Sequence, residues 1–309
     1  VPPLALPALT KAWGVPLYDG NLHSISATNV VGGTVTYSET ETGTYSATAI
    51  SKTNAGTYTI YAKFTPDANH SGVATKTAKL IINKANNPMT VTTPQSISMT
   101  YSTSSQNKNF TGASNAQGTV KYTVKSQTNS AGTAVTNFSI GTNTSATITA
   151  AAKTTVGTYT VVVTATADGN GNYSNSTRDI TLNITVAKQK VNPVTKLAVS
   201  NTGIVTWTNS SNATGYQISI NNSTWTSATS GVDYNSTIVA STGNRTVYVR
   251  AINSDTTNYT TPSDNASVTV TVYSVALTRG TGIDSVSGAG NYISGRSITI
   301  DAKVVTGYT

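Results

Sequence analysis

The stretch Lys52–Phe64, KTNAGTYTIYAKF, decides the fold, because a near copy of it, KTTVGTYTVVVTA, recurs at Lys153–Ala165. In each copy a Lys-Thr-x-x-Gly-Thr-Tyr-Thr phrase leads into alternating apolar and polar residues. Alternation with a period of two indicates a β-strand that turns one face toward a core. Gly56 and Gly157 are 157 − 56 = 101 residues apart, about the length of one β-sandwich domain. The repeat therefore predicts tandem sandwich domains.

The alternation also predicts which side chains are buried. In the first copy Tyr58 and Ile60 lie on one face with Ala62, while the threonines lie on the other face. In the second copy the inward set begins with Tyr159 and Val161. We therefore predict Ile60 and Val161 as core residues of their sandwiches.

Composition supports an all-β chain and excludes several functional classes. Of 309 residues, 37% are hydrophobic and 10% are charged, and no long window shows the 3.6-residue period of a helix. The net charge is +8, but the 19 lysines and arginines are scattered singly, unlike the basic stripe of a nucleic-acid-binding surface. There is no cysteine, which excludes disulfides, thiolate metal sites and cysteine nucleophiles.

Shared phrases divide the chain into successive units. GTVTY at Gly33–Tyr37 and GTVKY at Gly118–Tyr122 stand upstream of the two copies, and GIVTW at Gly203–Trp207 begins a third unit with different wording. We predict an all-β fold of sandwich domains arranged end to end, with an incomplete C-terminal β domain. The predicted boundaries are a linker at 1–9, domains at 10–85, 86–189 and 190–273, and a partial domain at 274–309.

The phrase NAGTYTIYA resembles the start of the F strand in immunoglobulin domains. The resemblance implies that Tyr58 and Tyr159 form tyrosine corners, in which the hydroxyl bonds to backbone before the strand. The family's inter-sheet cysteine is absent, so the packing of Ile60 or Val161 stands in its place.

More narrowly, residues 10–85 resemble the Tyr-Asp-Gly-containing repeats of bacterial surface proteins, the YDG and MBG families. The second unit is similar to other bacterial Ig-like repeats. The third resembles a fibronectin type III domain, which implies a core position for Trp207 and leaves Arg245 where the family places its corner tyrosine. The last 36 residues resemble the start of an internalin-type B repeat.

No residue pattern predicts a catalytic or metal site. His23 and His70 are the only histidines and have no metal-ligand spacing, and Glu39 and Glu41 are better explained as charges that discourage edge pairing. The turn at Ala167 carries one carboxylate, so a plain turn is favoured over a calcium loop. An intramolecular Lys–Asn crosslink is an alternative that we disfavour. We therefore expect no cofactor and no enzymatic activity.

A glycan site requires exposed aromatic side chains, and Trp13 and Trp225 are the best candidates. Packing against their own domains is the favoured role of both. Asn-x-Ser/Thr triplets, such as those at Asn172 and Asn235, are expected by chance from this composition and carry no functional weight.

The favoured function is a structural or adhesive stalk segment of an extracellular protein on a bacterial cell surface. Expected partners are host or cell-wall glycans or proteins and neighbouring repeats, through which the chain could self-assemble, with no nucleic acid and no membrane span. One alternative is a phage or other surface assembly, and a second is the carbohydrate-binding region of a secreted glycosidase. Because the chain lacks an initiator Met and stops within a strand pattern, we expect it to belong to a longer protein.

Overall fold

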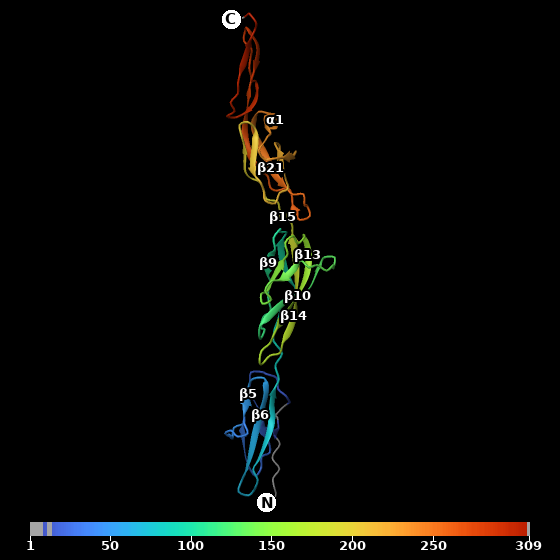
Figure 1. Ribbon diagram of the computed structural model, residues 1–309, viewed down its shortest axis with the longest axis vertical. Helices are drawn as coiled ribbons and strands as arrows, with labels where there is room; N and C mark the ends of the chain where they lie inside the picture. The colour runs from blue at the N-terminus through green and yellow to red at the C-terminus, as the bar shows by residue number, and fades with distance from the viewer. Residues whose placement is uncertain (1–8, 11–13, 308–309) are drawn as a thin grey trace. The chain divides into compact units, whose positions relative to one another are not determined.

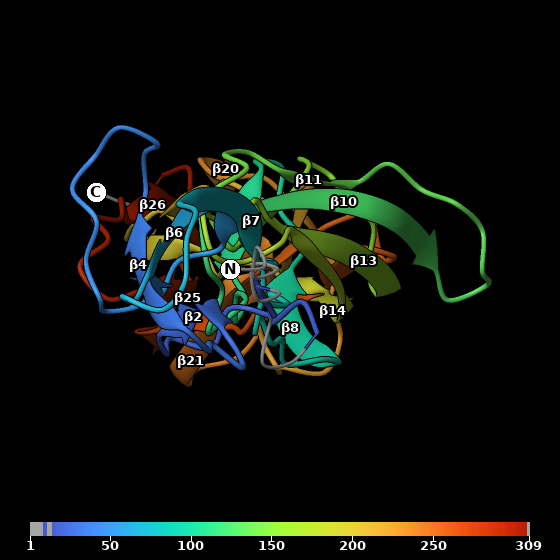
Figure 2. The same cartoon turned by 90° about the horizontal axis from the view of Figure 1, so that it is seen from below.

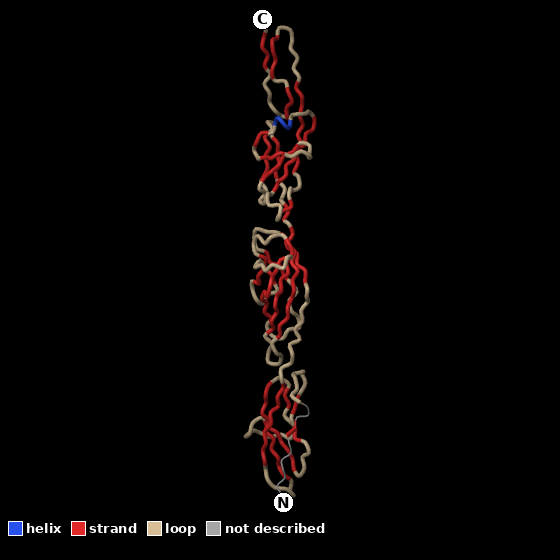
Figure 3. The backbone as a smooth tube through the Cα atoms, turned by 90° about the vertical axis from the view of Figure 1, so that its right-hand side faces the viewer, coloured by secondary structure: helices blue, strands red, loops and turns tan. Residues whose placement is uncertain are grey.

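The computed structural model describes residues 9–10 and 14–307, and these form β-strands and loops almost throughout (Figure 3). The only helix in this part of the chain is the single turn α1, Asn235–Ile238. The predicted all-β class is therefore confirmed. The predicted glycan residue Trp13 lies outside the described residues.

The chain divides into two compact units. One comprises the residues up to Ile97 together with Ser105–Ala151 and Thr158–Ile184. The other comprises Ser98–Ser104, Ala152–Gly157 and the chain from Thr185 onward. The division crosses the predicted domain 86–189, because three of its segments, 98–104, 152–157 and 185–189, belong to the second unit.

In the first sandwich, a three-stranded antiparallel sheet of order β4-β6-β7 packs against short strand pairs (Figure 1). Its long central strand β6 is the repeated phrase, and it alternates as predicted, with Ile60, Ala62 and Phe64 buried. Ile60 and Ala62 meet Ile25 and Leu80 in one core. The strands are β1 (Leu9–Thr10), β2 (His23–Ser24), β3 (Ser26–Ala27), β4 (Gly33–Ser38), β5 (Ser51–Lys52), β6 (Gly56–Pro66) and β7 (Ala74–Ile82).

In the second sandwich, a four-stranded sheet of order β10-β13-β14-β8 faces a three-stranded sheet of order β11-β12-β9. Tyr159, Val161 and Val163 of β13 are buried in its core. Figure 2 shows the loop that follows β10 standing clear of the sandwich. The strands are β8 (Gln95–Thr100), β9 (Gln106–Asn109), β10 (Val120–Asn129), β11 (Phe138–Ile140), β12 (Thr147–Ala150), β13 (Gly157–Ala167) and β14 (Ser176–Ala187).

In the third sandwich, a sheet of order β19-β18-β21-β23-β25 faces a sheet of order β16-β17-β20. Trp207 of β17 is 7% exposed, and its ring centroid lies 5.4 Å from that of Tyr216. The strands are β16 (Thr195–Val199), β17 (Ile204–Thr208), β18 (Gly215–Ser219), β19 (Thr226–Ala228), β20 (Val232–Asp233), β21 (Gly243–Ile252) and β23 (Ala266–Val275), with β15 (Gln189–Lys190) and β22 (Tyr259–Thr260) as a separate parallel pair.

The predicted partial domain 274–309 shares a sheet with the third sandwich. Strand β25 (Gly290–Ile293) pairs antiparallel with the end of β23 and extends its sheet. The remaining strands, β24 (Ile283–Ser287) and β26 (Asp301–Val304), pair antiparallel as a separate two-stranded sheet. Val304 of β26 is 53% exposed.

A tyrosine two residues after a glycine anchors the chain at two strand starts. The Tyr58 hydroxyl donates to the Asn54 carbonyl, four residues earlier, at 2.9 Å. The Tyr292 hydroxyl likewise donates to the Gly288 carbonyl, also four residues earlier, at 3.0 Å. A Cβ on Gly56 would lie 3.1 Å from the Tyr58 hydroxyl, so glycine lets the ring fold back over the backbone. Tyr159 is buried, and its ring centroid lies 5.1 Å from that of Phe138.

Two further tyrosines, one in each of the repeated phrases GTVTY and GTVKY, accept hydrogen bonds from backbone amides inside the sandwiches. The hydroxyl of Tyr37, in GTVTY, accepts a hydrogen bond from the Ala27 N–H at 2.8 Å. The hydroxyl of Tyr122, in GTVKY, accepts one from the Ala113 N–H at 2.9 Å. Both rings are buried, which keeps these hydrogen bonds away from water.

We predict that Tyr37→Phe destabilises the first sandwich by about 1–2 kcal/mol, because it leaves the Ala27 N–H without its acceptor. The measurement is urea unfolding followed by NMR through the amide signals of β6. Tyr61→Phe on the same sheet is the matched control and should change the unfolding free energy by less than about 0.5 kcal/mol. Equal effects of the two substitutions would contradict the assignment.

Candidate functional site

A single asparagine side chain ties the loop after β13 to the first sandwich. Asn172 Oδ1 accepts a hydrogen bond from the Ala55 N–H at 2.9 Å, and its Nδ2 donates to Asn54 Oδ1 at 3.1 Å. The Asn172 carbonyl accepts from the Ala85 N–H at 2.9 Å. Ala55 directly precedes Gly56, so this amide lies where strand β6 begins. We call this set of contacts the first junction.

A cation and two aromatic rings complete the first junction. Lys84 Nζ donates to the Asn170 carbonyl at 2.7 Å. The rings of Tyr18 and Tyr173 meet edge to face, with centroids 5.3 Å apart and planes at 76°. Edge-to-face packing brings the positive edge of one ring to the negative face of the other.

The second junction repeats the first with different residues. Asn258 Oδ1 accepts a hydrogen bond from the Val156 N–H at 3.1 Å, and Val156 directly precedes Gly157. The Asn258 carbonyl accepts from the Gln189 N–H at 2.9 Å. Gln189 then pairs in parallel with Tyr259 as strands β15 and β22.

The cation and the rings recur as well. Lys188 Nζ donates to the Thr256 carbonyl at 2.6 Å. The rings of Tyr101 and Tyr259 meet edge to face with centroids 5.3 Å apart and planes at 73°. In both junctions the lysine binds the carbonyl two residues before the asparagine.

Backbone bonds fix the linker in the same way at each junction. The Tyr18 N–H donates to the Asn83 carbonyl at 2.8 Å, and the Tyr101 N–H donates to the Ala187 carbonyl at 2.8 Å. Asn83 and Ala187 each directly precede the junction lysine. The aromatic residue, the linker and the asparagine loop thus form one repeated arrangement.

Hydrogen bonding and burial at the second junction shift the pKa values of two of its residues, Asp255 and Tyr259. Asp255 accepts a hydrogen bond from the Asn258 side chain at 2.9 Å, and this bond lowers the pKa of the Asp255 carboxyl below its ordinary value. Burial raises the pKa of the Tyr259 phenol. Both residues therefore keep their ordinary ionisation at neutral pH, with Asp255 charged and Tyr259 neutral.

The two histidines, which lack metal-ligand spacing, each bind one neighbouring aspartate. His23 Nε2 lies 2.9 Å from Asp19 Oδ1, and His70 Nδ1 lies 2.6 Å from Asp67 Oδ1. Hydrogen bonding to His70 lowers the pKa of Asp67. Within residues 9–10 and 14–307, no group of three or more His, Cys, Asp or Glu side chains is placed to hold a metal ion.

Lysine–aspartate pairs on the strands are exposed ion pairs. Lys125 Nζ lies 2.5 Å from Asp179 Oδ2, and Thr164 Oγ1 donates to the other oxygen at 2.8 Å. The bond from Lys125 lowers the pKa of Asp179, which keeps the carboxylate ionised. An ionised, exposed pair is a poor reactant for amide formation, which needs neutral amine and protonated acid. Elsewhere Lys52 Nζ reaches Glu39 at 2.7 Å.

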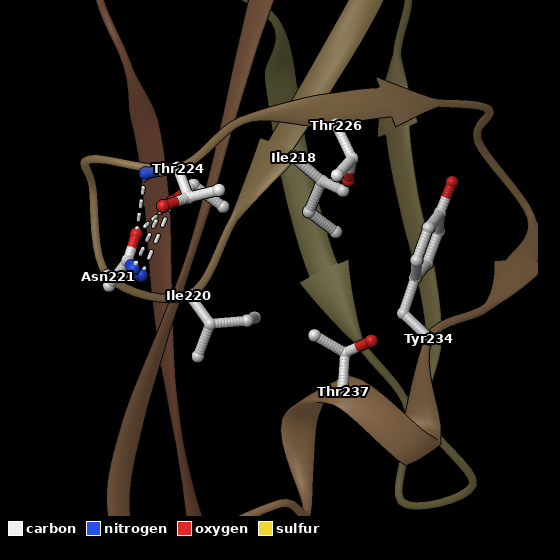
Figure 4. Close-up of a pocket in the computed structure, with 8 residues that line it drawn as sticks. Ile218, Ile220, Asn221, Thr224, Thr226, Tyr234 and Thr237 are labelled. Atoms are coloured by element: carbon white, nitrogen blue, oxygen red, sulfur yellow. Dashed lines mark hydrogen bonds between the residues drawn. The ribbon is translucent and has the colours of Figure 1, made fainter.

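One hollow of about 530 Å³, counting the open solvent above it, lies at the edge of the third sandwich. Figure 4 shows Ile218, Ile220 and Thr237 directed into it beside the ring of Tyr234. Its lining carries no charged side chain. Thr224 and Thr226, which flank Trp225 in the sequence, also line it.

Trp225, predicted as a candidate glycan contact, is half-buried beneath a guanidinium group. Arg250 Cζ lies 4.0 Å from the centroid of the Trp225 ring. Arg245 has a buried Nε atom without a hydrogen-bond partner among the described residues.

Sequence reasoning missed the junction residues. It marked Asn172 only within a chance glycosylation triplet. The available signal was the recurrence of Asn-Tyr followed by Ser or Thr, at 172–174 and again at 258–260.

Comparison with known proteins gives likeness to solved structures alone. No family model and no curated protein sequence matches the chain. Among solved structures, it is similar to Drosophila N-cadherin EC1-4 (14% identity, 82% of this chain and 70% of that one, TM-score 0.28). It is also similar to chicken CNTN1 FN1-FN3 (11%, 87% and 99%, 0.27) and to PcdhgB3 EC1-4 (12%, 85% and 75%, 0.29). The fold class rests on the strand pairing described above.

The described residues also include no helix that is long and apolar enough to cross a membrane.

We predict that Asn172→Ala speeds hydrogen exchange at the Ala55 amide by about 5- to 30-fold, because that N–H loses its acceptor. Native-state exchange measured by NMR on the full chain provides the readout. Asn175→Ala, an exposed asparagine three residues away, is the control and should leave the rate unchanged. Asn172→Asp keeps the acceptor oxygen and should restore most of the protection. Unaltered exchange in Asn172→Ala would show that the bond does not hold the junction.

Proposed function

We propose that the chain is a non-enzymatic structural and adhesive segment of an extracellular bacterial surface protein. The observation that carries this proposal is the repeated junction. An enzyme gains nothing from building the same contact twice at the ends of different sandwiches. A segment that must keep its domains coupled under load gains from each copy.

The chemistry of the junction supports a mechanical role. Each junction combines backbone hydrogen bonds, one side-chain amide, one lysine and one pair of rings, so several bonds must break together before the domains separate. Individual hydrogen bonds contribute only about 1 kcal/mol each, but bonds that share a loop act cooperatively. The bacterial and surface parts of the proposal rest on the resemblance to YDG and MBG repeats and on the absence of cysteine.

The surface composition supports an extracellular spacer. Outward positions of the long strands carry threonine and single lysines, such as Thr57, Thr59 and Lys63 of β6. Uncharged polar faces with scattered lysines keep strands soluble and discourage edge-to-edge pairing.

Single-molecule stretching of the full chain from its two ends tests this proposal. We expect separate force peaks, one for each sandwich, with contour-length gains of about 30 nm for each unfolded domain of roughly 100 residues. Each sandwich resists because its long strands must be pulled out of a closed hydrogen-bonded sheet.

Smooth extension without force peaks would contradict a load-bearing role. The paired variant Asn172→Ala with Asn258→Ala serves as the comparison chain. In this variant each sandwich still folds, so the contour-length gains should be unchanged. Any extension step that precedes the first unfolding event should be lost.

A further inference from the structure

The guanidinium group of Arg250 is held in place on the outer face of the third sandwich. Arg250 lies on β21 directly opposite Gln217 of β18, and its Nε donates to Gln217 Oε1 at 2.9 Å. Its Cζ lies 4.0 Å from the centroid of the Trp225 ring. Stacking and the hydrogen bond fix the plane of the fork from two sides, so binding through it loses little side-chain entropy.

This fixed cation has no anionic partner among the described residues. The ion pairs of residues 9–10 and 14–307 all use lysine or histidine, and none includes Arg250. Its Nη donors bind no acceptor in the same part of the chain. Partial burial without a compensating charge lowers the pKa of Arg250, although the group stays protonated at physiological pH.

The neighbours of the fork are neutral. Ser227 lies opposite Gln217 on β19, and Ser219 lies opposite Tyr248 one step along the sheet. Trp225 adds an apolar surface at the rim. A planar cation beside an indole, without a carboxylate from the protein, offers both a charged and an apolar contact to one ligand.

We propose that Arg250, Gln217 and Trp225 form a binding site for an acidic sugar, meaning a pyranose ring that carries a carboxylate. The two Nη atoms of the fork match the two carboxylate oxygens in a bidentate pair. The apolar C–H face of the ring can then pack against the indole.

A simple inorganic or organic anion does not suffice as the ligand, because an exposed ion pair alone contributes about 0–1 kcal/mol. A neutral sugar does not suffice either, because it leaves the fork without an anion. None of these three residues takes part in a junction, so the site exists independently of the load-bearing function proposed above.

Titration of the ¹⁵N-labelled full chain with glucuronate and with N-acetylneuraminate tests the site, since both carry a carboxylate on a pyranose ring and differ in source. Glucose and acetate, at matched ionic strength, supply the ring and the charge separately. We expect either acid to shift the Trp225 indole and Arg250 Nε signals with a Kd of about 1–10 mM, and the separate halves to shift them at least about tenfold more weakly.

Substitutions separate the contributions. Arg250→Gln should abolish the shifts, and Arg250→Lys should weaken binding about fivefold or more, because an ammonium lacks the fork. Trp225→Ala should remove binding while leaving the rest of the amide spectrum in place, which shows that the sandwich is folded. Arg178→Gln removes the same charge from the second sandwich and should change nothing.

Three results would overturn the proposal. The first is binding of acetate or glucose as strong as that of the acids, and the second is binding that survives Arg250→Gln. The third is no shift with either acid at concentrations up to about 100 mM, roughly tenfold above the weakest expected Kd. None of these results bears on the force peaks of the stretching experiment, so the two proposals fail separately.

Discussion

The backbone N–H that directly precedes a long central strand has no strand partner of its own, and at two places an asparagine from the next sandwich accepts its hydrogen bond. Ala55 and Val156 are these amides, and Asn172 and Asn258 supply the oxygens. An amide left unpaired in a packed contact costs about 1–3 kcal/mol. The start of each long strand is therefore completed only when the neighbouring loop is in place, and the coupling of sandwiches follows from that need.

The two junctions are alike in chemistry although their residues differ. The backbone N–H groups of Ala85 and Gln189 each donate to the carbonyl of the asparagine in their junction. Because such a bond does not involve the donor's side chain, either residue can make it. The rings and the lysine keep their identity, because edge-to-face packing and a reach to a carbonyl require specific side chains. A rule of this kind can join sandwiches of different sequence, such as the second, which resembles Ig-like repeats, and the third, which resembles fibronectin type III.

Much of the fold could be predicted from local pattern, since alternation with a period of two determines the faces of β6 and β13 without knowledge of partners. The bond from Tyr58 to the Asn54 carbonyl spans four residues and was likewise within reach of a local argument. The AGTY phrase at 55–58 recurs as AGNY at 289–292, and the same bond recurs at Tyr292. That signal was present in the sequence and was not used.

The site could not be predicted in the same way, because its bonds join residues far apart in the chain. Ala55 and Asn172 are 117 residues apart, and Val156 and Asn258 are 102 apart. Composition shows that the chain has many asparagines, but it does not show which of them accepts a hydrogen bond from the backbone N–H that precedes a long strand. Trp225 was identified as a candidate from its type alone, whereas its pairing with Arg250 depends on the register of β18 against β21. Register is set by packing over whole sheets, which a single sequence does not reveal.

Residual dipolar couplings on the first two sandwiches of the intact chain test the central claim most directly. Coupling through the first junction predicts one shared alignment tensor for β6 and β13, and two tensors of different magnitude once Asn172 and Lys84 are both replaced by alanine. Two independent tensors in the unaltered chain would contradict the account, because the junction would then be too weak to couple the sandwiches in solution.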